Sequence, residues 1–311
     1  MRIVFFGTPE FAVESLDAIM ESRHEVVAVV TVPDRPAGRG KHLMPSAVKE
    51  YAESHKLPVL QPEKLRDESF LEKLRSYEAD CFVVVAFRML PETVWAMPPK
   101  GTFNLHASLL PRYRGAAPIN RAIMQGEKES GVTTFLLNHH IDEGNILLQE
   151  RTPMAEDETA GSLHDRLASM GRKLVVDTLD GLANGTINPR PQTGEPCPAP
   201  KIFKEDTHID FNNSAVEVER LVRGLSPYPA AILTLINPHN EAINFKVTAC
   251  LASKEPTNTA PKTLVCDGKK VLKIAANDCF VYILELQMAG KKKNKIEDFL
   301  RGTNLTDWKL A

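Results

Sequence analysis

The run CFVVVAF, residues 81–87, consists almost entirely of β-branched and aromatic side chains. This composition favours a strand that is buried on both faces of a sheet. Two further runs share it, RIVFF (2–6) and EVVAVVT (25–31), and TFNLH (102–106) is a fourth expected strand. Helical patterns separate these runs, at residues 9–20, 46–55 and 67–77, with a short extended stretch at 58–61. Apolar strands that alternate with helices predict an α/β fold with a Rossmann-like, doubly wound, mostly parallel sheet.

The chain changes character after a long helical pattern at residues 161–185. Residues 189–206 are rich in proline and lack apolar periodicity, so we expect a linker there. Beyond it, a helical pattern at 214–225 precedes several short apolar runs separated by turn residues, which is typical of a small β-barrel. The sequence therefore predicts a Rossmann-like domain over 1–188 and a C-terminal, OB-like β-barrel domain over 207–311.

The composition is that of an ordinary globular protein, with 43% hydrophobic and 25% charged residues in a chain of 311. Its five cysteines are scattered and form no C-x-x-C pair, which argues against a disulfide framework and against a structural zinc site. The apolar run at the N-terminus is too short for a signal peptide or a membrane span. We therefore expect a cytoplasmic protein that needs no membrane and no metal, and we expect a monomer.

Charge is distributed unevenly along the chain. Residues 207–311 carry 14 Lys and Arg against 11 Asp and Glu, whereas the preceding residues are acidic on balance. The C-terminal third is thus the better partner for a polyanion. Two basic stretches stand out, PDRPAGRGKHLMPS (33–46) and AGKKKNK (289–295). Both suit contacts with phosphates, although solvated loops have the same composition.

Polar side chains gather where the strand at 102–106 ends. Asn104 and His106 are two residues apart, so on a strand they point to the same face. An amide can donate a hydrogen bond to a developing oxyanion, and an imidazole can move a proton near neutral pH. Asp142, in a polar turn between two strand-like runs, is a third candidate because its carboxylate could orient His106. The structural alternative is a capping asparagine, a core histidine and a turn aspartate.

Two other enzyme classes fit this sequence less well. A serine hydrolase would use Ser108 with His106 and Asp142, but the G-x-S-x-G nucleophile elbow is missing. A dinucleotide-binding oxidoreductase needs a G-x-G-x-x-G fingerprint, whereas the turn after the first strand has only Gly7 followed by Pro9. Neither class explains the residues at 103–120.

The chain resembles the methionyl-tRNA formyltransferase family over essentially its whole length. The resemblance is carried by FFGTPEFA (5–12), PDRPAGRGKHLMPS (33–46), FNLHASLLPRYRGAAPIN (103–120) and the Asp142-x-Gly144 turn. The last two are shared by the wider family of enzymes that use 10-formyltetrahydrofolate, and the 33–46 loop is more particular to the tRNA enzymes. The resemblance implies formyl transfer from 10-formyltetrahydrofolate to the methionine α-amino group on initiator methionyl-tRNA, for translation initiation.

The resemblance also implies roles for individual residues. Asn104, His106 and Asp142 would be catalytic. The folate cosubstrate would lie against two segments, which contribute Ser108, Leu109, Leu110, Pro111, Phe87, Arg88 and Leu90. The tRNA would contact the basic stretches and the C-terminal barrel, through Arg39, Lys41, Lys291, Lys292 and Lys293.

One departure from the family pattern concerns the folate segment. Where the family usually has Ala-Tyr-Gly, this chain has Ala86-Phe87-Arg88. Replacing the glycine by Arg88 adds a cation and removes easy access to positive φ, so either the backbone does not need that freedom or the pterin pocket is reshaped. Two further alternatives stay open: a sister formyltransferase acting on glycinamide ribonucleotide or an amino-sugar, and a nonenzymatic RNA-binding protein.

Overall fold

The chain divides into two compact units in the computed structural model, which describes residues 1–37, 42–305 and 307–311. Unit 1 comprises Met1–Pro118, Glu129–Pro153 and His164–Pro200. Unit 2 comprises Ile119–Lys128, Met154–Leu163 and Lys201–Ala311. Two short stretches that the sequence placed in the first domain therefore belong to the second compact unit, and the linker limits stay a prediction.

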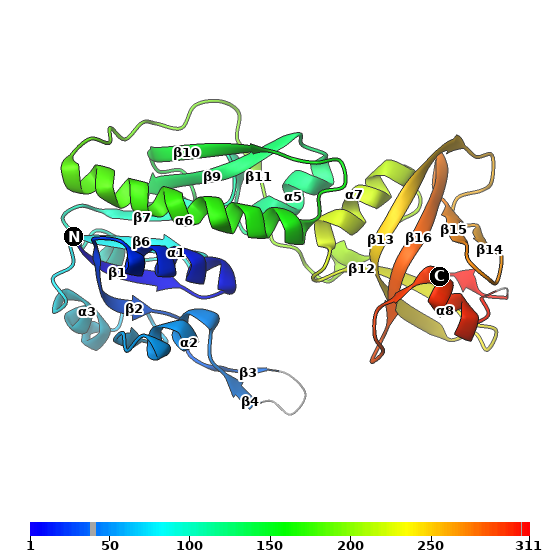
Figure 1. Cartoon of the computed structure of the whole chain (residues 1–311), viewed down its shortest axis with the longest axis horizontal. Helices are drawn as coiled ribbons and strands as arrows, with labels where there is room; N and C mark the ends of the chain where they lie inside the picture. Colours follow the sequence, from blue (N-terminus) through cyan, green and yellow to red (C-terminus); the bar gives the residue numbers. More distant parts are fainter. Residues whose placement is uncertain (38–41, 306) are drawn as a thin grey trace. The chain divides into compact units, whose positions relative to one another are not determined.

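Unit 1 is built on a seven-stranded sheet with the strand order β10-β9-β7-β6-β1-β2-β5 (Figure 1). The strands are β1 (Arg2–Gly7), β2 (Glu25–Val30), β5 (Val59–Leu60), β6 (Cys81–Val85), β7 (Thr102–His106), β9 (Glu129–Leu136) and β10 (Ile146–Pro153). Neighbours from β5 to β7 pair in parallel, while β9 and β10 add two antiparallel strands beyond β7. The predicted Rossmann-like, mostly parallel sheet is confirmed.

Both faces of this sheet are covered, which is why its central strands β1, β2 and β6 are almost entirely apolar. Alternate residues of β1, β2 and β6, including Val4, Phe6 and Phe82, pack with Leu71 and Leu74 of α3. On the opposite face, Leu105 of β7 meets Gly171 of α6, where a Cβ atom would lie 2.5 Å from the leucine side chain. Asn104 and His106 alternate with Leu105 and therefore point to the α3 face.

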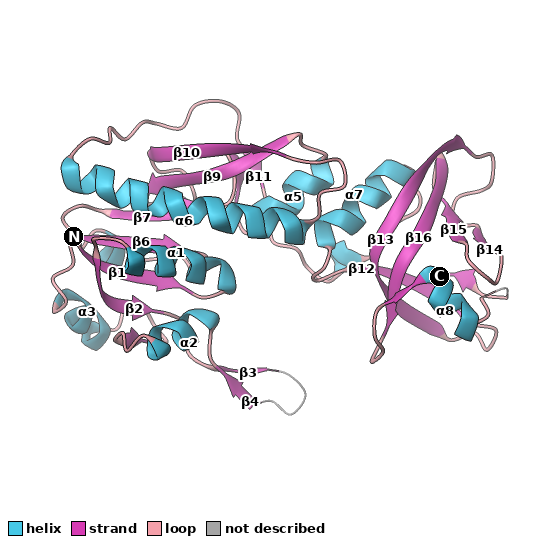
Figure 2. Cartoon of the chain, viewed as in Figure 1, coloured by secondary structure: helices cyan, strands magenta, loops and turns pink. Residues whose placement is uncertain are grey.

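Four helices of unit 1, α1, α2, α3 and α6, lie close to their predicted positions, and α4 and α5 are additional (Figure 2). They are α1 (Glu10–Glu21), α2 (Ala47–Ser54), α3 (Glu68–Arg75), α4 (Glu92–Trp95), the start of α5 (Pro118–Gln125) and most of α6 (Ala160–Asn184). Pro9, predicted to lie in the first turn of α1, occupies its N-cap position instead. Ion pairs from Arg172 of α6 to Asp17 and Glu21 of α1 tie these two helices together on one face.

The proline-rich segment after α6 is packed against unit 1. The backbones of Arg190 and Ile146 exchange hydrogen bonds of 2.8 and 3.0 Å. Further along, β11 (Cys197–Pro198) pairs with β8 (Arg112–Arg114), and the backbone N–H of Ala199 donates to the Arg114 carbonyl at 2.7 Å. Another small pair, β3 (Arg35–Ala37) with β4 (His42–Met44), flanks the 38–41 stretch.

Unit 2 contains an antiparallel sheet that forms a nearly closed barrel, as predicted, with the order β14-β15-β16-β13-β12-β18 and β17 on β16. Its elements are η1 (Glu205–Thr207), α7 (Ala215–Leu225), β12 (Ala231–Ile236), β13 (Ala242–Pro256), β14 (Leu264–Cys266), β15 (Leu272–Ala275), β16 (Cys279–Met288), β17 (Asn294–Lys295), α8 (Ile296–Gly302) and β18 (Lys309–Leu310). Strand β12 alternates buried and half-buried residues, so one face lines the core.

Candidate active site

Strand β7 brings the predicted amide and imidazole to the same side of the sheet. Asn104 is paired with Val84 of β6 on one side and with Phe135 of β9 on the other. Its Oδ1 atom is buried and has no hydrogen-bond partner among the described residues. A buried polar atom without a partner costs free energy, on the order of 1–3 kcal/mol, unless a ligand satisfies it. Asn104 is therefore suited to hold a polar group of a bound substrate.

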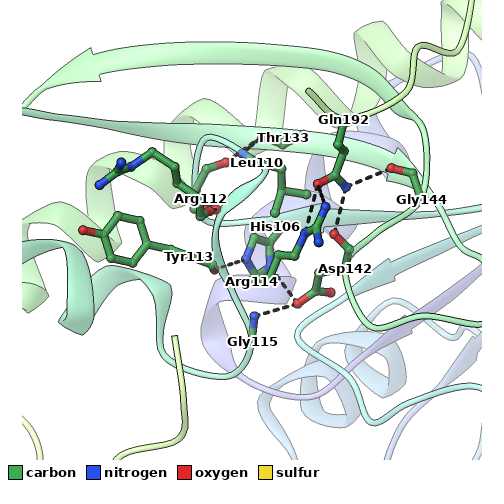
Figure 3. Close-up of polar contacts among 11 residues, drawn as sticks. His106, Leu110, Arg112, Tyr113, Arg114, Gly115, Thr133, Asp142, Gly144 and Gln192 are labelled. Carbon is green, nitrogen blue, oxygen red and sulfur yellow. Dashed lines mark hydrogen bonds and ion pairs between the residues drawn. The ribbon is translucent and has the colours of Figure 1, made fainter. Parts of the chain in front are cut away.

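His106 is buried, and its ring is fixed from two sides. Its Nε2 atom lies 2.8 Å from the Tyr113 carbonyl oxygen, which can only accept, so Nε2 carries a proton (Figure 3). The ring packs edge-on against Phe135. Its other nitrogen, Nδ1, lies 3.9 Å from Asp142 Oδ2, which is too long for a direct hydrogen bond. A substrate N–H or a water can therefore bridge the two atoms.

Asp142 lies in the turn between β9 and β10 and has a left-handed backbone, with φ of 55°. Its Oδ2 atom accepts a 2.8 Å hydrogen bond from the backbone N–H of Gly115. The same turn contains Gly144, where a Cβ atom would lie 1.5 Å from the Leu136 carbonyl oxygen. Only glycine fits there, because the backbone of the turn that presents Asp142 packs directly against the Leu136 carbonyl.

Ser108 is used structurally. Its Oγ donates a 2.7 Å hydrogen bond to the Arg112 carbonyl, and its own carbonyl accepts one of 2.6 Å from Thr133 Oγ1. The hydroxyl proton of Ser108 is thus directed at a backbone oxygen and not at His106. This geometry removes the hydrolase alternative and explains the compact turn at 108–112.

A cavity of about 410 Å³ lies along this turn. It is lined by residues of unit 1, among them the predicted folate residues Leu109, Leu110 and Pro111, followed by Arg112. Asn104, His106 and Asp142 do not line it. Leu110 is also packed in a small apolar cluster with Phe135 and Ile146, so part of the 108–111 segment is committed to the core. The folate role of this segment stays a prediction.

The second predicted folate segment follows β6. The left-handed residue here is Ala86, with φ of 47°, and Arg88 is not among the described residues with positive φ. The backbone at Arg88 therefore does not need the freedom of a glycine. The Arg88 guanidinium donates to the carbonyls of Glu63 and Pro62, and burial lowers its pKa. Leu90 is buried in the sheet core, and the Phe87 ring packs edge-on against Phe6.

Two residues that the sequence analysis missed contact the Asp142 turn (Figure 3). Gln192 donates from Nε2 to the carbonyls of Asp142 at 2.8 Å and Gly144 at 2.9 Å. Arg114 donates to Gln192 Oε1 and to Glu143 Oε1. These partners are 29 to 78 residues apart, so local sequence patterns carry no signal for them.

Of the predicted tRNA contacts, Arg39 and Lys41 lie outside the described residues. Lys291, Lys292 and Lys293 are exposed between β16 and β17 of unit 2. Lys293 Nζ also lies 2.7 Å from Glu285 Oε2, so that residue is partly neutralised. In the part of the chain that the structure describes, no His, Cys, Asp and Glu cluster could hold a metal ion, and no helix is long and apolar enough to cross a membrane.

Comparisons with known proteins match both units. A family model described as formyl transferase covers residues 1–179, and one described as formyl transferase, C-terminal domain, covers residues 201–304. A methionyl-tRNA formyltransferase from Bacteroides fragilis is 50% identical over 99% of this chain and 96% of its own. One from Flavobacterium johnsoniae is 46% identical over 99% and 98%.

Solved structures share the fold at lower identity. The sugar 3N-formyl transferase WlaRD, solved in the presence of dTDP and 5-N-formyl-THF, has a TM-score of 0.67 and is 20% identical, over 94% of this chain and 99% of its own. HypX from Aquifex aeolicus, in complex with tetrahydrofolic acid, has a TM-score of 0.65 and is 19% identical, over 99% of this chain and 48% of its own. At these identities the likeness concerns the fold.

Proposed function

Since this chain belongs to the methionyl-tRNA formyltransferase family, we propose that it moves the formyl group of 10-formyltetrahydrofolate to the α-amino group of methionine on initiator methionyl-tRNA. It is a transferase that acts in translation initiation. Identity near 50% over the full length of these relatives favours this substrate over a nucleotide or amino-sugar. We place the reaction in the cytoplasm, where initiator tRNA is charged.

The assignment of the active site rests on three residues that lie close together at the end of β7, namely Asn104, His106 and Asp142. Among the described residues the buried amide oxygen of Asn104 has no hydrogen-bond partner, and His106 Nδ1 faces Asp142 Oδ2 across 3.9 Å. The oxygen and the NH₂ group of an amide are assigned from their hydrogen-bond partners, so the NH₂ group of Asn104 can be the one that faces a bound oxyanion. These are the hydrogen-bond donors and acceptors that formyl transfer to an amine requires.

In the reaction, the methionine nitrogen forms a bond to the formyl carbon, and the carbonyl oxygen becomes negative. Asn104 donates to this oxygen from its amide NH₂, and His106, as an imidazolium, donates from Nδ1 while Nε2–H stays on Tyr113. Asp142 takes the proton that the attacking amine loses, directly or through water. The intermediate then collapses, the bond from carbon to the folate N10 breaks, and N10 receives the proton that Asp142 took up.

Folate is the donor cosubstrate of this family fold, and the residues present can accommodate it. The NH₂ group of the Asn104 amide is the donor that would contact the formyl oxygen. We propose that Phe87, Arg88 and Leu90 on one side and Ser108 to Pro111 on the other flank the cosubstrate. The carbonyl-bonded guanidinium of Arg88 would then form a wall of the pterin pocket.

The catalytic assignment is tested with purified protein, 10-formyltetrahydrofolate and charged initiator tRNA. We expect Asn104→Ala, His106→Ala and Asp142→Ala each to lower turnover about 100-fold or more, since losing one oxyanion donor costs on the order of 3 kcal/mol. The three variants should still bind tRNA. His239→Ala, an exposed histidine in unit 2, is the control and should match the wild type.

Near-normal turnover in any of the three variants removes that residue from the mechanism. If the wild-type protein fails to formylate methionyl-tRNA but formylates glycinamide ribonucleotide or an amino-sugar, the sister activity is the correct one.

The tRNA contacts form a separate part of the proposal. We propose that Arg39 and Lys41 recognise the tRNA acceptor end, and that Lys291, Lys292 and Lys293 contact its backbone. Arg39→Ala should raise the KM for methionyl-tRNA and leave hydrolysis of the formyl donor intact. Lys64→Ala, an exposed lysine on another loop, is the control. An unchanged KM in Arg39→Ala contradicts the role of this loop.

A further inference from the structure

Gln192 lies between Arg114 and the turn that presents Asp142 (Figure 3). Its Nε2 atom donates to the Asp142 carbonyl at 2.8 Å and to the Gly144 carbonyl at 2.9 Å. Its Oε1 atom accepts from Arg114 Nε at 3.1 Å and Nη2 at 2.8 Å. All four contacts lie within unit 1. The side chain thus joins both ends of the Asp142-Glu143-Gly144 turn to β8.

The orientation of this amide is determined by chemistry. A guanidinium has only donors, so the atom that faces Arg114 must be the amide oxygen. The NH₂ group then faces two carbonyl oxygens, which can only accept. Arg114 also donates to Glu143 Oε1 at 2.8 Å, so the guanidinium itself is held at a second point.

Asp142 needs such support because its backbone is left-handed. A residue with a Cβ atom at φ of 55° carries a conformational cost that the surrounding structure must offset. Gly115 N–H holds the carboxylate end of Asp142, and Gln192 holds its carbonyl. Together these bonds determine where Oδ2 lies relative to His106.

The segment that carries Gln192 is itself fixed. Two residues before it, Arg190 pairs through its backbone with Ile146 of β10. After it, Ala199 is bonded to Arg114 and to Ala117 through backbone hydrogen bonds of 2.7 and 3.1 Å. The segment that carries the amide is therefore anchored to unit 1 on both sides of Gln192.

We propose that Gln192, oriented by Arg114, is a positioning residue that sets the place of the Asp142 carboxylate. Its side-chain hydrogen bonds go to Arg114 and to the carbonyls of Asp142 and Gly144, so it acts through the turn at 142–144. The inference rests on the proposed role of Asp142 in formyl transfer. It gives a role in positioning Asp142 to a proline-rich segment of unit 1.

Gln192→Glu is the decisive variant. The carboxylate keeps the contact with Arg114, as a stronger charge-assisted pair, but it cannot donate to the two carbonyl oxygens and instead repels them. Turnover by the full-length protein should fall about 10- to 100-fold, since small misplacements of a catalytic group have effects of this size. The KM values and the thermal midpoint should stay close to those of the wild type. The same Gln-to-Glu change at exposed Gln125 is the matched control.

A double-mutant cycle with Asp142→Asn tests the route of the effect. In that background Gln192→Glu should change turnover by less than about twofold, because the group it positions is already lost. Wild-type turnover in Gln192→Glu, or an equally large loss in both backgrounds, overturns the inference. Full activity of Asp142→Asn alone would instead refute the proposed role of Asp142.

Discussion

Thr133 forms a hydrogen-bonded centre beneath the 108–112 turn. Its Oγ1 donates to the Ser108 carbonyl at 2.6 Å and accepts from Leu110 N–H at 3.3 Å and from Gln149 Nε2 at 2.9 Å. Thr133, Ser108 and Leu110 are 0%, 2% and 3% exposed. Water therefore cannot replace these bonds in the folded protein.

Thr133→Val keeps the shape of the side chain and removes these bonds. The Ser108 carbonyl and the Leu110 N–H are then buried without partners, at about 1–3 kcal/mol each. The Leu110 hydrogen bond is long, so its loss should cost an amount near the lower limit of this range. We therefore expect the free energy of unfolding of unit 1 to fall by about 2–4 kcal/mol. Thr133→Ser retains the hydroxyl and should lose much less.

Urea unfolding can report on unit 1 alone. The chain has two tryptophans, Trp95 in unit 1 and Trp308 in unit 2, so Trp95 fluorescence in a Trp308→Phe background follows the relevant transition. If Thr133→Val unfolds within about 0.5 kcal/mol of Thr133→Ser, the buried bonds do not stabilise the turn. Turnover should fall with stability, since the turn leads into Tyr113, whose carbonyl holds His106.

Three further predictions concern single residues. Gly144→Ala places a Cβ atom 1.5 Å from a backbone oxygen, so we expect at least about a tenfold loss of turnover with the circular dichroism of a folded protein; wild-type turnover would contradict it. Burial raises the pKa of the Cys81 thiol to about 12, so the unfolded chain loses this proton first as pH rises. Stability should therefore decline by about 1.4 kcal/mol per pH unit from about pH 8.5 to 12, and Cys81→Ala, measured by Trp95 fluorescence, should remove this slope. Ser214→Ala removes the capping box with Glu217 and should destabilise unit 2 by about 1 kcal/mol in Trp308-monitored unfolding, with no change if the cap is unimportant.

The sequence predicts the strands of unit 1 well because their residues satisfy a local requirement. CFVVVAF is apolar on both faces and TFNLH on one, through Phe103 and Leu105, and β6 and β7 lie within these runs. The polar end of TFNLH likewise indicates where a site should form, because a sheet edge is the expected ligand position.

The residues of the site that the sequence does not predict are those held by contacts between distant parts of the chain. Gln192 lies in a stretch whose prolines predict a linker, and its partners are Arg114 and the turn at 142–144. Nothing in the local pattern distinguishes it from an exposed glutamine. The sequence also does not indicate which residue after β6 is left-handed. Ala86 adopts this conformation, whereas the family has its glycine at the position of Arg88.

The two-unit arrangement has a consequence for the design of fragments. Unit 2 includes 119–128 and 154–163, and Met124 packs against its core while Asn120 Nδ2 donates to the Gly224 carbonyl at 2.7 Å. The Arg223 guanidinium bonds to the Glu158 carbonyl in the same way. A C-terminal fragment that begins near residue 200 would leave the barrel without these pieces and expose its apolar surface. Chimaeras between relatives should therefore exchange all three stretches together.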